Sequence, residues 1–206
     1  MKTNTLPNFL LAANEINIIG PCSTTISAID LELPSIVVDG GMNHHLQLKN
    51  SFSVGDGDST DGPLDLKLPT QKDQSDLSYA LSLLTSETKI INLYGFLGNR
   101  KDHELINIGE VYSACEKYAF TAKFDSEFLI IPEGFHTLNI SGEFSVMTLR
   151  ESLITIVGRA RYMLEKETLL GPLSSHGLSN YADGEITITC NTPLIIYTQE
   201  QSPTLS

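Results

Sequence analysis

Hydrophobic residues in the first part of the chain gather in short runs that end near glycine, proline or aspartate. The runs occupy residues 16–20, 35–39, 51–54, 89–94 and 127–131. Short apolar runs bounded by turn residues are typical of buried strands. Residues 60–68, which are rich in Asp, Gly and Pro, are predicted as loop.

Two segments between these runs have helical periodicity instead. Residues 76–84 place Leu77, Ala80, Leu81 and Leu84 on one face, and Asp73 or Ser75 can cap the start of this helix. A second apolar face follows, and its members are Leu105, Ile108, Tyr112 and Cys115. Strands that alternate with helices favour an α/β fold with a mostly parallel sheet, and ligands bind such sheets at the carboxyl ends of the strands.

The pattern changes after Pro132. Short β-like pieces follow at residues 135–140, 143–149, 153–157, 161–164, 185–190 and 194–198, most of them separated by turn residues. This spacing predicts an all-β sandwich or barrel. We therefore predict two domains, an α/β domain over residues 1–132 and a β domain over residues 133–206.

Composition and charge exclude several classes of protein. The chain has 206 residues and a net charge of −12, which argues against nonspecific nucleic-acid binding, although Mg²⁺ could still bring in a nucleotide. No apolar run approaches the ~20 residues that span a bilayer. Residues 1–7 lack the pattern of a signal peptide, so a cytoplasmic location is expected. The three cysteines form neither a zinc pattern nor a disulfide framework.

Three acidic clusters lie between residues 53 and 103, beside Gly and Ser at the ends of apolar runs. They read S-V-G-D-G-D-S at 53–59, Q-K-D-Q-S-D-L at 71–77 and G-F-L-G-N-R-K-D-H at 95–103. Carboxylates that are brought together repel one another unless a cation holds them, and Mg²⁺ commonly bridges carboxylates to phosphates. The clusters thus predict a Mg²⁺-dependent enzyme that acts on a phosphorylated substrate. Taken alone, Asp56-Gly57-Asp58 could be a solvated turn. Asp76 could have no role other than to stabilise the N-terminus of its helix.

Five motifs in order along the chain carry a resemblance to a known family. They are D-G-G (39–41), G-D-x-D-S (55–59), K-D-x-S-D (72–76), G-x-R-x-D-H-x-x-x-N (98–107) and G-L-S-N (177–180). The series resembles the thiamine pyrophosphokinases (thiamine diphosphokinases) from about residue 16 to residue 197. The resemblance implies a Rossmann-like, three-layer α/β domain followed by a β-sandwich domain. It also implies a homodimer that transfers the pyrophosphoryl group of ATP to the hydroxyl of thiamine, at sites between the α/β domain of one subunit and the β domain of the other.

The same resemblance implies roles for individual residues. Asp56, Asp58 and Asp73 match the Mg²⁺ ligands, and Asp39 and Asp76 match further acidic positions around the metal and phosphates. Arg100 matches an arginine on the ATP phosphates, and Asp102 could position the thiamine hydroxyl or a metal-bound water. Ser179 and Asn180 match the pair that contacts the thiamine pyrimidine. The nucleotide side of the predicted site also includes Gly40, Gly41, Lys72, Asn99 and His103.

Two features depart from the family pattern. Asn99 stands where the family usually has glycine, and the chain contains no Trp, which stacks on thiamine in some members. Tyr162 and Tyr181 are candidates for that stacking. Two alternatives stay open: pyrophosphoryl transfer to another hydroxymethyl heterocycle, such as a pterin, and a non-catalytic regulator that binds a nucleotide or thiamine.

Overall fold

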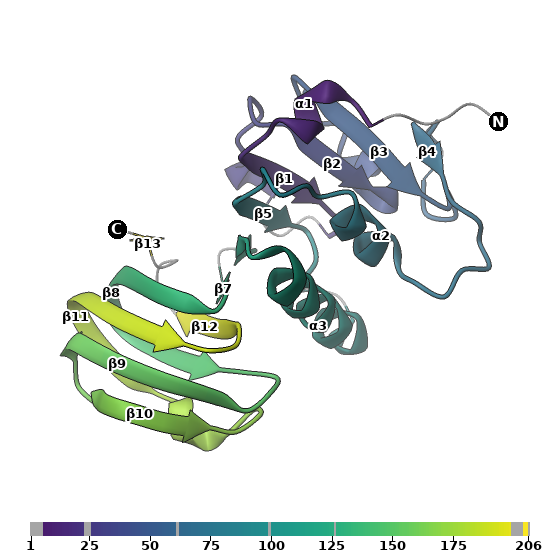
Figure 1. Cartoon of the computed structure of the whole chain (residues 1–206). Helices are drawn as coiled ribbons and strands as arrows, with labels where there is room; N and C mark the ends of the chain where they lie inside the picture. The colour runs from purple at the N-terminus through teal and green to yellow at the C-terminus, as the bar shows by residue number, and fades with distance from the viewer. Residues whose placement is uncertain are drawn as a thin grey trace. The chain divides into compact units, whose positions relative to one another are not determined.

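The computed structural model describes residues 6–22, 26–60, 62–98, 100–125, 127–198 and 204–205. The chain forms two compact units, Met1–Ala114 and Cys115–Ser206. Figure 1 shows their helices and strands, coloured along the sequence. The predicted domain boundary at residue 132 stays a prediction. Among the helices of the described ranges, none is long and apolar enough to cross a membrane.

A parallel sheet forms the centre of the first unit. Its order is β5-β1-β2-β3-β4, and its described strand pairs are all parallel. The strands are β1 (Glu15–Ile19), β2 (Ser35–Val38), β3 (Ser51–Gly55), β4 (Leu66–Lys67) and β5 (Ile90–Tyr94). The predicted mostly parallel α/β arrangement of this part is therefore confirmed. The prediction of residues 60–68 as entirely loop is wrong, because β4 pairs with the end of β3.

Short helices accompany this sheet, and a long one follows it. They are α1 (Asn8–Leu11), α2 (Asp76–Ser82), α3 (Lys101–Tyr118) and the 3₁₀ helices η1 (Ile26–Ala28) and η2 (Asp39–His44). Ser75 caps α2, since its Oγ accepts a hydrogen bond from Ser78 N at 2.9 Å. In α3 the predicted apolar face is wrong at Leu105, which is 69% exposed, because the helix packs through its later turns, where Tyr112 and Cys115 are buried.

The second unit is a mainly antiparallel β structure. Its strand order is β10-β9-β11-β8-β12-β7-β6, and β13 pairs with β8. The strands are β6 (Thr121–Phe124), β7 (Phe128–Ile131), β8 (Gly134–Met147), β9 (Ser152–Ala160), β10 (Leu164–Leu170), β11 (Asn180–Cys190), β12 (Leu194–Thr198) and β13 (Thr204–Leu205). The 3₁₀ helix η3 (Ser175–Gly177) precedes β11. Alternate residues of these strands, such as Leu138, Phe144 and Ile186, form one buried core.

The structure corrects three strand predictions in this unit. Residues 135–140 and 143–149 belong mostly to one strand, because Gly142 continues β8 and pairs with Ala182 of β11. Residues 161–163 are not a strand, since they turn the chain from β9 to β10, and Leu164 is the first residue of β10, the rest of which was not predicted. Strand β6 was missed, because residues 121–124 are too few and too mixed in polarity to give a clear period.

Candidate functional site

Two predicted site carboxylates come from neighbouring parallel strands. Val38 of β2 pairs with Val54 of β3, so Asp39 and Asp56 follow two adjacent strands at the same edge of the sheet. Asp39 has a φ of +38° and begins η2. A side chain at Gly55 would bring its Cβ within 2.6 Å of Asp39 Cβ, so this close approach requires glycine.

A third carboxylate completes a group that could hold a cation. Asp39, Asp56 and Asp58 each offer a carboxylate oxygen, and these oxygens all lie within 4.8 Å of one another. Asp39 is 6% exposed and Asp56 is 9% exposed. We call these three residues the carboxylate trio. Such an all-oxygen set suits a hard divalent cation such as Mg²⁺.

Backbone hydrogen bonds order the loop around the carboxylate trio. The carboxylate of Asp39 accepts hydrogen bonds from Gly57 N at 3.0 Å and from Ser59 N at 3.2 Å. Asp56 Oδ1 accepts a hydrogen bond from Asp58 N at 3.2 Å. These hydrogen bonds therefore hold the three carboxylates close together, although the negative charges of the carboxylates repel one another.

Lys72 supplies positive charge to this acidic edge. Its Nζ donates to Asp56 Oδ2 at 2.6 Å and lies 3.2 Å from Asp76 Oδ1. The hydrogen bond from Lys72 lowers the pKa of Asp56. Burial raises the pKa of Asp76, and Lys72 only partly offsets this. Burial disfavours the charged form of Lys72, but its contacts with Asp56 and Asp76 outweigh this and raise its pKa.

Replacing Lys72 by methionine is expected to destabilise the protein in metal-free buffer at pH 7. Lys72→Met keeps most of the side-chain length but leaves Asp56 and Asp76 without their cation. The free energy of unfolding in urea should fall by about 2 kcal/mol, the scale of a charge-assisted hydrogen bond. Lys89→Met is the matched control, because Lys89 is exposed and its Nζ donates to a backbone oxygen, that of Ser86, at 2.7 Å. Equal effects of the two changes would contradict the assigned role of Lys72.

The structure separates Asp73 from the other predicted metal ligands. Asp73 is exposed and is not a member of the carboxylate trio, whereas Asp39 is. Asp76 begins α2 and shares the Lys72 ammonium with Asp56 of the trio. Asp39 was predicted as an outer acidic residue. The signal for its closer role was the Asp-Gly-Gly that ends the strand next to β3.

Arg100, which directly precedes α3, and His103, in the first turn of α3, lie beside the residues that follow β1 and β5. They line a small cavity together with Pro21, Cys22, Gly95, Phe96 and Asn107. Arg100 Nε donates to Asp102 Oδ1 at 3.1 Å, and this guanidinium lowers the pKa of Asp102 to about 2. Both side chains are exposed, so the pair is open to solvent. Asn99 lies outside the described residues.

Gly40 and Gly41 serve close packing in this structure. A Cβ at Gly41 would lie 2.5 Å from Ile19 O, and one at Gly40 would lie 3.0 Å from Pro21 Cβ. The first turn of η2 therefore packs against the end of β1, and this contact fixes the direction in which Asp39 leaves β2.

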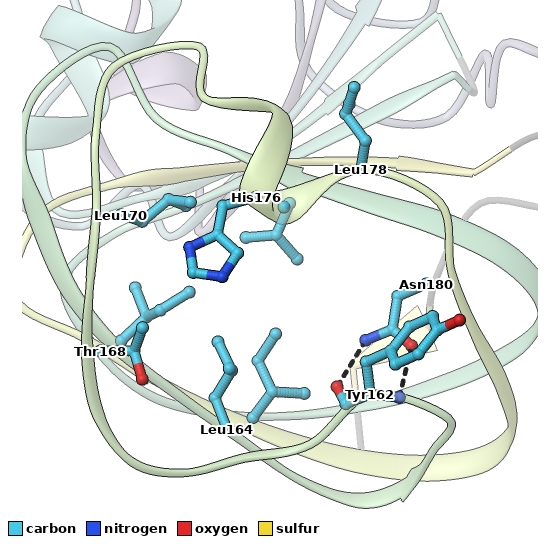
Figure 2. Close-up of a pocket in the computed structure, with 11 residues that line it drawn as sticks. Tyr162, Leu164, Thr168, Leu170, His176, Leu178 and Asn180 are labelled. Atoms are coloured by element: carbon cyan, nitrogen blue, oxygen red, sulfur yellow. Dashed lines mark hydrogen bonds between the residues drawn. The ribbon is translucent and has the colours of Figure 1, made fainter.

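Ser179 and Asn180 lie in the second unit. Ser179 is exposed, has a φ of +55° and donates from its backbone N to Ser145 Oγ at 3.1 Å. Asn180 begins β11 and is 7% exposed. Asn180 also lines a cavity of about 200 Å³, shown in Figure 2. The wall is largely aliphatic, and its other polar members are Tyr162, Thr168 and His176.

Comparisons with known proteins place this arrangement among solved structures. No protein-family model matches the chain, and no curated protein matches it. The structure is similar to thiamine pyrophosphokinase from Bacillus subtilis, with a TM-score of 0.72, 22% identity and coverage of 90% of this chain and 99% of that chain.

Two fungal structures extend the comparison. Thiamin pyrophosphokinase from Candida albicans has a TM-score of 0.69 at 11% identity, over 91% of this chain and 89% of that chain. The yeast enzyme has a TM-score of 0.58 at 12% identity, over 98% of this chain and 90% of that chain. The resemblance inferred from the motifs is thus confirmed for the architecture, and the chain has the thiamine pyrophosphokinase fold.

Proposed function

We propose that this protein is a thiamine pyrophosphokinase of the cytoplasm, which transfers the pyrophosphoryl group of ATP to the hydroxyl of thiamine and releases AMP. The observation that carries the proposal is the carboxylate trio at the carboxyl edge of the parallel sheet, with Lys72 bound to one member. The shared fold with enzymes of that name supports the same reaction.

The residues of the first unit suit pyrophosphoryl transfer. The reaction joins the thiamine hydroxyl oxygen to the β-phosphorus of ATP and breaks the bond from that phosphorus to the oxygen that bridges it to the α-phosphorus, so that AMP and the hydroxyl proton are released. Such transfer depends on positioning and charge neutralisation more than on covalent catalysis. Asp39, Asp56 and Asp58 would hold Mg²⁺, which neutralises phosphate charge when bound.

Other residues would position the two substrates. Arg100 would bind phosphate oxygens, because its planar fork can donate to two oxygens at once. Asp102, which holds Arg100, would position that fork and the attacking hydroxyl. Lys72 would limit repulsion between the carboxylates and the incoming phosphates.

The acceptor would bind in the second unit, at the cavity that Asn180 and Tyr162 line. In this proposal the first unit is a Rossmann-like nucleotide domain and the second is a β-sandwich that binds thiamine. The working form is a homodimer in which each site combines the first unit of one subunit with the second unit of the other. The division of the candidate residues between the two units supports this arrangement.

One assay separates this proposal from its alternatives. Purified protein incubated with ATP, Mg²⁺ and thiamine should give AMP and thiamine diphosphate in equal amounts, and chelation of Mg²⁺ should stop both. AMP formed only with a hydroxymethyl pterin would assign the second acceptor class. Binding of ATP or thiamine without AMP formation from either acceptor would favour the regulator.

A further inference from the structure

Hydrogen bonds to backbone groups use most of the hydrogen-bonding capacity of the Asn180 carboxamide. Its Oδ1 accepts hydrogen bonds from Tyr162 N at 2.9 Å and from Tyr181 N at 2.8 Å. Its Nδ2 donates to Tyr162 O at 2.8 Å. Figure 2 shows the two bonds to Tyr162, which is 18 positions earlier in the chain. The side chain of Asn180 therefore pairs with both backbone polar groups of Tyr162, as a neighbouring strand would.

These bonds limit what Asn180 can offer a ligand. An amide oxygen accepts two hydrogen bonds and an amide nitrogen donates two. Both sites on Oδ1 are used, and one of the two Nδ2 hydrogens is used. The oxygen therefore cannot accept a further hydrogen bond from a bound heterocycle. The hydrogen bonds of this side chain instead hold the protein's own backbone at Tyr162 and Tyr181.

The segment that Asn180 holds is the turn between β9 and β10, which we call the Tyr162 turn (residues 161–163). The ladder between β9 and β11 reaches Ala160 and Ala182, and Arg161 N donates to Tyr181 O at 2.8 Å. The bonds of Asn180 extend this pairing one residue further, to Tyr162. Tyr162 is 61% exposed and lines the cavity, so the position of its ring depends on the backbone of its turn.

We propose that Asn180 is a positioning residue that fixes the Tyr162 turn, and that the Tyr162 ring forms the aromatic wall against which the acceptor heterocycle binds. The inference rests on the proposed function only in naming thiamine as that acceptor. The aliphatic lining from Leu164 and Leu170 suits a flat ring, and an aromatic face attracts a cationic ring such as the thiazolium of thiamine. Tyr181 does not line this cavity; Arg161 lies over its ring at 5.1 Å from the centroid.

The absence of Trp from the sequence provides a direct test. Tyr162→Trp introduces the single indole of the protein into the Tyr162 turn. In this background, Asn180→Leu removes all three hydrogen bonds and keeps much of the side-chain volume. Asn180→Ala removes the three hydrogen bonds and most of the side-chain volume as well. We expect each to lower the fluorescence anisotropy of the ligand-free protein at 25 °C. The dissociation constant for thiamine should rise about tenfold, the effect of losing one or two net hydrogen bonds, and the KM for ATP should not change.

A reporter at a second place separates local from general effects. Tyr118→Trp places the single indole at the end of α3 instead, outside the residues that line the cavity. Asn180→Leu should leave the anisotropy of that reporter near that of its parent, and the protein should still unfold in one cooperative urea transition, at a lower midpoint because three hydrogen bonds are lost. Unchanged anisotropy at position 162 in both Asn180 variants would overturn the positioning role, even if thiamine binding weakened, because Asn180 would then act by direct contact.

The experiment also separates a failure of the positioning role from a failure of the proposed function. If the protein neither bound nor used thiamine, the anisotropy at position 162 would still fall in the Asn180 variants, and only the identity of the acceptor would be lost. If the protein used thiamine with an unchanged KM in Tyr162→Ala, the aromatic wall would be overturned while the reaction stood.

Discussion

Asp56→Asn is expected to lower kcat for AMP release by about 10³-fold, the scale of removing one preorganised electrostatic contact from a transition state. Asp56 is buried, belongs to the carboxylate trio and receives the shortest of the hydrogen bonds that the trio accepts, from Lys72 at 2.6 Å. Asparagine keeps the shape of the side chain but removes its negative charge. Binding of Mn²⁺, measured by electron paramagnetic resonance without ATP, should weaken in parallel.

Two further variants serve as a control for net charge and as a test of Asp73. Asp30→Asn changes the net charge equally at an exposed position outside the trio, so turnover should stay near normal. Asp73→Asn tests whether Asp73 joins the metal set, as the motif resemblance implies. A loss as large as that of Asp56→Asn would include Asp73 in the set. Normal turnover and normal Mn²⁺ binding in Asp56→Asn would show that the trio does not hold the metal.

The strands that form the site were predictable because each is a short apolar run between turn residues. Residues 35–39 and 51–54 were predicted as strands, and β2 and β3 occupy nearly the same positions. The sequence did not specify that β2 and β3 are neighbours, with Val38 paired to Val54. That pairing brings Asp39 to Asp56, a neighbour relation that the spacing of the motifs along the chain does not reveal, and the set of metal ligands stays a prediction.

Predictions failed where tertiary contacts decide the local structure. Gly142 suggested a break, but its pairing with Ala182 continues β8 through it. Residues 161–164 were predicted as a strand, yet Asn180 binds both backbone groups of Tyr162, and residues 161–163 form a turn that ends where β10 begins at Leu164. Asp73 lies in an irregular loop ahead of α2, where no strand register defines the direction of its side chain.

Mixing two defective variants is expected to restore activity if the working unit is a homodimer with composite sites. The first variant is Asp56→Asn, which damages the metal side in the first unit. The second is Tyr162→Ala with Asn180→Ala, which damages the cavity in the second unit and is assayed at thiamine concentrations below its KM. Each homodimer carries its defect in both sites. A mixed dimer carries both defects in one site and none in the other.

Two-fold symmetry gives the size of the rescue. A mixed dimer with one intact site should have about half the wild-type activity, and free exchange of equal amounts produces about half mixed dimers, so the mixture should reach about a quarter of wild type. Subunit exchange is verified by co-purification of an untagged variant with a tagged one, and each variant incubated alone is the control. With exchange demonstrated, a mixture no more active than the average of the two variants incubated alone would mean that each subunit builds its site from its own two units. Rescue would instead show that the first unit of one chain acts with the second unit of another, because each variant has a defect in one of its own two units.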